Sequence, residues 1–192
     1  MPPPNAHGSF HELVLTTERL VLRPPVVGDA AAAYELLGDP EVMRFLGGER
    51  VPSDDVPKVI EKWLDRWRAN GMGPLIVELR ESRRFLGRTG ILVWDTRTWT
   101  HGTSFADAGS YAQPELGWAI ARAHWGHGYA TEAARAVRDW ARTHRSVENL
   151  ISLIAPENSA SQRVAQRLGA SPAETVRLFD SGDAVVWRHP DG

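Results

Sequence analysis

The stretch from residue 115 to residue 143 constrains this chain most strongly, because it runs from a strand through a glycine turn into a helix. Residues 115–120 have the apolar content of a short buried strand, and residues 129–143 repeat apolar side chains at helical spacing. Gly126 and Gly128 lie between them, within Trp125-Gly126-His127-Gly128-Tyr129-Ala130. Two residues without a Cβ let backbone N–H groups turn inward, and the helix N-terminus adds partial positive charge. The turn is therefore a candidate phosphate cradle.

Composition limits the class of protein. The chain has 192 residues, enough for one domain with a hydrophobic core, and a net charge of −2 offers no basic surface for nucleic acid. It contains no cysteine, which excludes disulfides, thiolate metal sites and a cysteine nucleophile. Its seven histidines show no ligand spacing, so no metal is expected.

The N-terminal region carries no targeting signal. Residues 1–12 lack the apolar core of a secretory signal, and no apolar run reaches the roughly 20 residues that a membrane helix needs. We expect residues 1–12 to form a flexible tail, residues 13–192 to form a single domain, and the protein to be cytoplasmic, without a membrane partner.

Apolar patterns and turn residues predict the order β-α-α-β-β-β-α-β-α-β-β. Asp29 and Ser53 are the expected N-caps of the first two long helices, and Gly71 is expected to end the second. Strands are expected at 20–23, 74–79, 85–94, 115–120, 150–154, 175–179 and 184–188; helices are expected at 30–37, 41–45, 53–70, 129–143 and 159–168. Ser181-Gly182-Asp183 is expected to turn the last hairpin. This pattern predicts an α/β protein with a mixed sheet.

Other phosphate-binding motifs do not fit the glycine turn. A dinucleotide-binding loop needs a third small residue where this chain has Thr131, and no acidic residue follows at the expected distance. A P-loop needs Gly-Lys-Ser/Thr, which is absent. From the residues alone, a tight structural turn remains the alternative to a phosphate site.

Three motifs in order resemble a known family. Gly126-x-Gly128-Tyr129-Ala130-Thr131-Glu132-Ala133 is preceded by Pro114-Glu115-Leu116-Gly117-Trp118 and followed by Asn158-Ser159-x-Ser161-Gln162-Arg163. With the opening Thr17-Glu18-Arg19-Leu20-Val21-Leu22-Arg23-Pro24, they resemble the GNAT superfamily of N-acetyltransferases, and most closely its ribosomal-protein N-terminal (alanine/serine) acetyltransferases. The resemblance spans residues 17–189. It implies a mostly antiparallel mixed sheet of about seven strands, splayed between the fourth and fifth, with helices on both faces.

The resemblance also implies acetyl-CoA as co-substrate and assigns residues to it. Backbone groups of Trp118, Ala119 and Ile120 would bind the pantetheine arm, and Asn158 would bind it from the opposite side. Main-chain amides from Trp125 to Ala130, with Thr131, would hold the diphosphate. The full cofactor set is Trp118, Ala119, Ile120, Trp125, Gly126, His127, Gly128, Tyr129, Ala130, Thr131, Asn158, Ser161 and Arg163, with Arg167 as an alternative to Arg163.

The implied reaction is direct transfer of acetyl to a primary amine, on a protein N-terminus or a small molecule, in a ternary complex. Attack needs a neutral amine, so a base is required, and Glu115 at the start of the central strand is the candidate. A solvated strand-end carboxylate is its structural alternative. A backbone N–H of residues 118–120 would stabilise the oxyanion. Ser161 would face the thiol as proton donor or packing partner.

Two departures from the superfamily pattern matter. Many members carry a tyrosine acid on the helix after Asn158, where this chain has Ala165, and many begin the glycine loop with Arg or Gln, where it has Trp125. A catalytically silent acyl-CoA-binding domain is the second functional hypothesis, and a nicotinamide oxidoreductase is a third. The aromatic segment 95–113 is expected to wall the acceptor site, to form a homodimer contact, or to fold back over the core, and residues 41–51 are expected to contribute to acceptor specificity.

Overall fold

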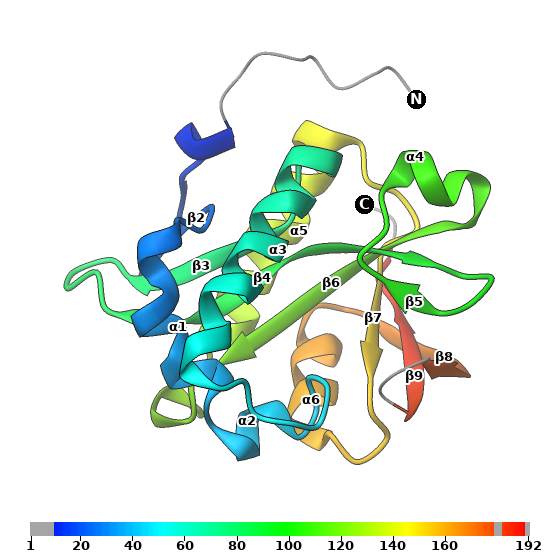
Figure 1. The fold of residues 1–192 in the computed structure, drawn as a ribbon. Coiled ribbons are helices and arrows are strands. Elements are labelled where there is room, and N and C mark those ends of the chain that lie inside the picture. The colour runs from blue at the N-terminus through cyan, green and yellow to red at the C-terminus, as the bar shows by residue number, and fades with distance from the viewer. Residues whose placement is uncertain (1–9, 179–181, 191–192) are drawn as a thin grey trace.

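A mixed sheet forms the centre of the protein (Figure 1). The computed structural model describes residues 10–178 and 182–190. Its strands are β1 (Leu15–Thr16), β2 (Leu20–Arg23), β3 (Pro74–Leu79), β4 (Phe85–Asp95), β5 (Thr100–His101), β6 (Ala112–Ile120), β7 (Ile151–Ile154), β8 (Ser171–Leu178) and β9 (Gly182–Arg188). They lie in the order β1-β2-β3-β4-β6-β7-β9-β8, with β5 paired to β4. The sheet among the described residues has nine strands, so the expected number of about seven was too low.

The two additional strands, β1 and β5, are two residues long each, too short to show any alternation of apolar and polar side chains. The expected splay between the fourth and fifth predicted strands is confirmed. These strands are β6 and β7, the parallel neighbours in an otherwise antiparallel set, and they share a single residue pair, Glu115 with Ile151.

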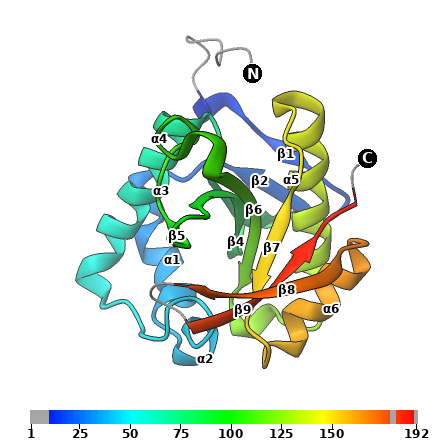
Figure 2. The same cartoon turned by 90° about the vertical axis from the view of Figure 1, so that its right-hand side faces the viewer.

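Helices cover both faces of the sheet. They are α1 (Ala30–Leu37), α2 (Pro40–Met43), α3 (Val56–Asn70), α4 (Phe105–Ala108), α5 (Tyr129–Arg145) and α6 (Ser159–Arg167). Figure 2 shows α1 and α3 on one side of the sheet and α5 and α6 on the other. Helix α3 packs Ile60, Trp63, Leu64 and Trp67 inward at helical spacing and ends at Gly71, whose φ of 63° suits glycine.

The core divides along the sheet because strand side chains alternate between its faces. Leu75 and Val77 of β3 pack with Val137 and other residues of α5, whereas Ile76 between them packs with α1, α2 and α3. Burying one such aliphatic side chain stabilises the fold by about 1.5–3 kcal/mol. The two helical layers are thereby fixed on a common sheet whose central strands carry the site.

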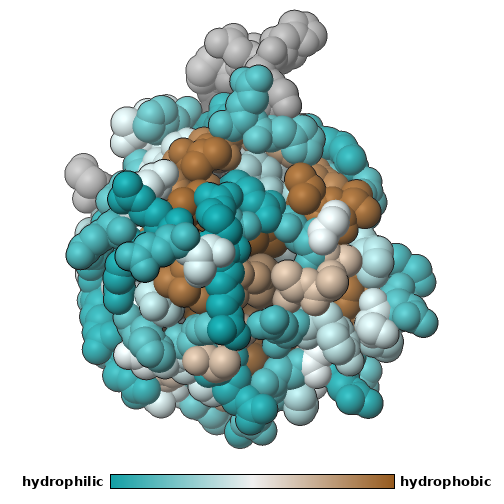
Figure 3. Space-filling model, turned by 90° about the vertical axis from the view of Figure 1, so that its left-hand side faces the viewer, coloured by the Kyte–Doolittle hydropathy of each residue, from teal (hydrophilic) through white to brown (hydrophobic). Residues whose placement is uncertain are grey.

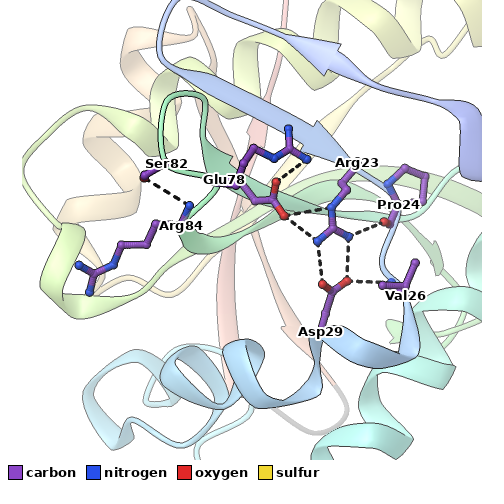
Figure 4. Close-up of polar contacts among 8 residues, drawn as sticks. Arg23, Pro24, Val26, Asp29, Glu78, Ser82 and Arg84 are labelled. Atoms are coloured by element: carbon purple, nitrogen blue, oxygen red, sulfur yellow. Dashed lines mark hydrogen bonds and ion pairs between the residues drawn. The ribbon is translucent and has the colours of Figure 1, made fainter.

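A buried ion-pair network fastens β2 to β3 and to the start of α1 (Figure 4). The Arg23 guanidinium donates to both carboxylate oxygens of Asp29, at 2.7 and 2.9 Å, and to Glu78 Oε1 at 2.6 Å. Hydrogen bonding to Asp29 raises the pKa of Arg23 above its ordinary value, against the effect of burial. Asp29 precedes α1 as expected, but its side chain makes no capping hydrogen bond to that helix, because Arg23 and the backbone N–H of Val26 occupy it.

The chain before β1 is partly folded. Phe10–Glu12 form a 3₁₀ turn, and the Phe10 ring stacks on Trp67 with centroids 5.6 Å apart. The expected tail therefore extends too far, because an aromatic side chain that packs on the core holds residues 10–12 in place. Residues 1–9 lie outside the described part, as does Ser181 of the predicted last turn.

Other boundaries differ slightly from expectation. Ser53 begins a short 3₁₀ turn, and Asp55 is the residue that precedes α3. Strand β8 begins at Ser171, four residues before the expected start. The face at the left of Figure 1 is mainly hydrophilic, broken by separate apolar patches (Figure 3). None of the helices in the described part is long and apolar enough to cross a membrane.

Candidate active site

The site lies where β6 and β7 part. Strand β6 pairs with β4 along nine residues, from Gly87–Ile120 to Asp95–Ala112, but with β7 at Glu115–Ile151 alone. A cavity of about 630 Å³ opens around this gap. Its walls come from the segment after α2, from β4, β6 and β7, from the glycine turn, and from α6. The gap thus joins the glycine turn on one side of the sheet to the α2 segment on the other.

The glycine turn leaves its amides free. Gly126 and Gly128 have φ angles of 81° and 80°, which glycine adopts without strain. The Trp125 N–H donates to Arg122, but within the described chain no protein acceptor is found for the backbone N–H groups of residues 126–131. The Thr131 hydroxyl, which also lines the cavity, is buried without a partner. Free amides at the start of a 17-residue helix and an unsatisfied hydroxyl fit a diphosphate.

Side chains hold this turn from outside. The Trp125 indole N–H donates to the Ile120 carbonyl at 2.7 Å, and Arg19 donates to the His127 carbonyl at 3.0 Å. Arg19 also pairs with Glu132, whose pKa is lowered by hydrogen bonds from Thr17 and Arg19 that outweigh the opposing effect of burial. The turn conformation is therefore fixed without using the amides that face the cavity.

His127 and Trp125 have structural contacts of their own. The His127 ring nitrogen Nδ1 lies 2.8 Å from the Trp125 carbonyl, and its ring stacks on Tyr129 with centroids 5.5 Å apart. Trp125 is 49% exposed, with one edge anchored to β6. Both residues shape the turn.

Backbone groups of β6 face the gap at alternate residues. The Leu116 carbonyl accepts from Ser152 of β7, and the Ile120 carbonyl accepts from Trp125, so both point away from β4. Since every second residue of a strand directs its N–H and C=O to the same edge, Trp118 also faces the gap and Ala119 faces β4. The Ala119 backbone is thus directed to β4 although Ala119 lines the cavity, and its expected place in the cofactor set stays a prediction. The Ala119 side chain instead packs with α1 and α3 on the acceptor side.

Helix α6 presents Asn158 and Ser161 to the cavity. Asn158 caps the helix as expected, its Oδ1 accepting the Ser161 N–H at 3.0 Å. That oxygen is thus engaged, which leaves the Asn158 amide nitrogen as the group available to a ligand. The Ser161 Oγ accepts from the Trp118 indole at 3.3 Å, so its own proton stays available. Arg163 and Arg167 lie exposed at the cavity rim.

Glu115 is a buried carboxylate in the middle part of β6, only 7% exposed, so the solvated strand-end alternative is wrong. Its Oε2 accepts from the Trp94 indole at 2.9 Å. Burial raises the pKa of Glu115, and the Trp94 hydrogen bond, Arg88, the Leu153 amide and Arg66 oppose that rise. A carboxylate with a raised pKa at the junction of the two halves of the cavity is suited to accept a proton.

Several cavity residues were not predicted from the sequence, among them Arg88, Trp94 as a partner of Glu115, and His101. His101 from β5 stacks on Trp94, with centroids 5.1 Å apart. Segment 95–113 thus contributes one cavity residue through β5. The rest includes α4, whose first residue, Phe105, packs on the core, and a homodimer contact stays a prediction. Among the described residues, no three His, Asp or Glu side chains gather as a metal site would require.

One hydrogen-bond chain spans the narrow end of the gap. The Ser152 hydroxyl donates to the Leu116 carbonyl at 2.7 Å and lies 3.0 Å from His189 Nε2. Since the hydroxyl proton goes to Leu116, the His189 nitrogen must donate to Ser152. Burial, with Arg138 and Arg142 nearby, lowers the pKa of His189 to about 4. A neutral His189 thus completes the bridge between β6 and β7.

Comparison with known proteins agrees with this geometry. The chain is 32% identical to the uncharacterized protein YkkB of Bacillus subtilis over 179 residues, 91% of this chain and 94% of that one. It is 28% identical to an uncharacterized N-acetyltransferase, p20, of Bacillus licheniformis, over 86% of each chain. An acetyltransferase structure from Agrobacterium tumefaciens superposes with a TM-score of 0.75 at 31% identity, covering 96% of this chain and 98% of that one.

A structure of RimL, a ribosomal-protein acetyltransferase in complex with coenzyme A, shares the fold with a TM-score of 0.73. The two sequences are 11% identical, and the superposition covers 92% of this chain and 97% of the RimL chain. The family model for the acetyltransferase (GNAT) domain matches residues 19–171, which include the glycine turn, β6 and α6. The chain therefore belongs to the GNAT acetyltransferase family.

Proposed function

We propose that this protein transfers the acetyl group of acetyl-CoA to a primary amine. The observation that carries the proposal is the set of free backbone amides at residues 126–131, which lies where the β6–β7 gap opens. The turn and Thr131 would hold the diphosphate, and the backbone of Trp118 would bind the arm. The gap leads from there to Glu115, so the cofactor and an amine would meet from opposite sides of the sheet.

The side chains at the junction account for the proton transfers. When bound, acetyl-CoA supplies the acetyl group as a reactive thioester. An α-amine has a pKa of about 8 and a lysine amine a pKa of about 10, so much of either is protonated at neutral pH. Glu115 would take the proton as the new N–C bond forms. As the C–S bond breaks, the Ser161 hydroxyl, for whose proton no acceptor is found among the described residues, would donate to the leaving sulfur.

Direct transfer between the two bound substrates is the route that this chain allows most simply. With no cysteine, an acetyl-cysteine intermediate cannot form. The cavity reaches both faces of the sheet through one gap, so both substrates can be present together.

The test is a thiol-release assay over a panel of amines, with acetyl-CoA affinity measured separately by calorimetry. The panel includes peptides with N-terminal Ala or Ser, free lysine, amino acids and polyamines. We expect acetyl-CoA to bind and at least one class of amine to release coenzyme A with formation of the N-acetyl product. Tight binding without turnover on any amine would favour the silent acyl-CoA-binding domain, and failure to bind would reject both functions.

A further inference from the structure

Arg88 of β4 is a half-buried cation for which the described residues provide no salt-bridge partner. Its side chain lines the cavity, and its Nε is buried without a hydrogen-bond partner. Within the described residues no ion pair or hydrogen bond to its guanidinium is found; its aromatic contact is with the Trp63 ring, 5.7 Å from the centroid. A half-buried guanidinium whose Nε is buried without a hydrogen-bond partner is costly, so its position beside the cavity points to a ligand that pairs with it.

The Arg88 guanidinium and the Glu115 carboxylate converge on one small space. Gly117 lies between them on β6, and a Cβ placed on it would lie 3.6 Å from Glu115 Oε1 and 3.8 Å from Arg88 Nη1. The two side chains form no salt bridge within 4 Å. A small molecule that fills this space would contact both groups at once.

The charges around this space are unbalanced. Arg88 interacts electrostatically with Glu115 and with Arg66 of α3, and Arg66 in turn interacts with Glu115. Burial lowers the pKa of Arg88 to about 10 and also lowers that of Arg66, yet both remain cationic near neutral pH. Two cations therefore face a single carboxylate, and that carboxylate already accepts from Trp94. A second anion would balance the site.

We propose that the acceptor is a small amine that also carries a carboxylate or phosphate group, which pairs with Arg88. The anion would lie within a few bonds of the nitrogen, because Arg88 and Glu115 reach the same space above Gly117. α-Amino acids and phosphorylated amino alcohols have this chemistry. The inference rests on the proposed function, since it names the substrate class for the same site.

Matched pairs of acceptors provide the test. The wild-type protein and Arg88→Gln are assayed with L-alanine against L-alaninamide and with phosphoethanolamine against ethanolamine, with rates compared per concentration of neutral amine. We expect the wild type to favour the anionic member of at least one pair tenfold or more in kcat/KM. Arg88→Gln should remove that preference, because its kcat/KM should fall at least tenfold further for the anionic member of the pair than for the neutral member. The two pairs distinguish carboxylate from phosphate.

Several outcomes would overturn the proposal. Equal or better turnover of the neutral members by the wild type would do so, as would turnover of peptides without regard to their charge. An equal loss for both members in Arg88→Gln would show a structural role. Arg88→Lys, which keeps the charge, should retain part of the preference; if Arg88→Gln does not fold, Arg88→Lys and the wild-type preference decide.

Failure of the proposed function is distinguishable from failure of this inference. If the wild type binds acetyl-CoA but acetylates none of these amines, calorimetry on the protein saturated with coenzyme A tests the anion site directly. Binding of L-alanine or phosphoethanolamine by the wild type, weakened at least tenfold in Arg88→Gln, would support the anion site without catalysis. No binding, or equal binding by both proteins, would reject it.

Discussion

The two sides of the β6–β7 gap expose different parts of the chain to the cavity. On the glycine-turn side the available groups are main-chain amides of residues 126–131, and the side chains nearby mostly hold the turn from outside. On the other side the available groups are side chains on paired strands, chiefly the buried Glu115 and the half-buried Arg88. One side depends on backbone conformation, and the other on the chemistry of a few residues.

This difference separates what members of a fold can share from what distinguishes them. A turn held by glycines and a helix terminus binds a diphosphate whatever the neighbouring side chains are. A buried carboxylate beside an unpaired guanidinium selects among amines, because each charge must meet its complement when water is excluded. Binding on the cofactor side should therefore survive changes of side chain but not changes of backbone conformation. Binding on the acceptor side should be lost when its side chains change.

The largest effect is expected from Glu115→Gln, which changes the acceptor side alone. Loss of the base should lower kcat roughly 100- to 10,000-fold, with little change in acetyl-CoA affinity. Because burial raises the pKa of Glu115 and the carboxylate must be ionised to accept a proton, wild-type kcat/KM should fall as pH drops through that raised pKa. Steady-state kinetics across pH check both points, and the acidic limb should vanish in the variant.

Glu78→Gln is the matched control, since Glu78 is equally buried but pairs with Arg23 away from the cavity. It should lower stability and leave the pH profile intact. If kcat/KM of Glu115→Gln still falls at acidic pH as in the wild type, Glu115 is not the base. The acceptor side would then have no assigned catalytic residue.

The next effect is expected from Gly128→Val, which changes the cofactor side alone. Valine at a φ of 80° is strained by about 1–3 kcal/mol, and its side chain would obstruct the approach of phosphate. Acetyl-CoA should bind at least tenfold more weakly to a protein that still folds. Calorimetry with circular dichroism gives both quantities.

Gly182→Val separates strain from recognition. Gly182 has a φ of 82° and open space around it, but it lies in β9 and does not line the cavity. This variant should lose comparable stability and keep full acetyl-CoA affinity. Were Gly128→Val to bind the cofactor normally, the diphosphate would have to sit elsewhere.

The smallest effect is expected from Ser161→Ala, where the two sides meet. The hydroxyl is held by the Trp118 indole and has a proton to give, so we expect kcat to fall about tenfold with unchanged cofactor affinity. Ser159→Ala on the exposed first turn of α6 is the control and should behave as wild type. Equal rates for Ser161→Ala and wild type would leave Ser161 a packing role.

Local patterns in the sequence predicted most of the fold. Side-chain periodicity predicted the apolar face of α3 and the helix α5, and glycine conformation predicted the end of α3 at Gly71 and the turn before α5. Both signals act over a few residues. Strands β1 and β5 could not be predicted, because a strand of two residues shows no alternation of apolar and polar side chains. Each forms only by pairing with a longer strand of the sheet. The Asp29 side chain was misassigned for a related reason, because its carboxylate pairs with Arg23, which also binds Glu78 from a distant part of the sequence.

The site was predictable on the side built from backbone. The glycine turn, Thr131 and Asn158 come from motifs, but the orientation of Ala119 depends on which edge of β6 faces β4. Arg88 gave no signal, because an arginine on a strand is usually solvated, and only the pairing of β4 with β6 beside Gly117 encloses it. The burial of Glu115 likewise depends on Trp94 and on strand β7, which follows 36 residues later in the chain.

The parting of β6 from β7 also bears on stability. Beyond the Glu115–Ile151 pair, the hydrogen bond from the Ser152 hydroxyl to the Leu116 carbonyl helps to join the last three strands to the rest of the sheet. A ligand arm lying along Trp118 would supply the hydrogen bonds that a neighbouring strand would otherwise make, so the cofactor becomes part of the architecture. Saturation with coenzyme A should accordingly raise the melting temperature, since a ligand that binds only the folded chain stabilises it. Cells with depleted coenzyme A would then hold this protein in a looser, more easily degraded form.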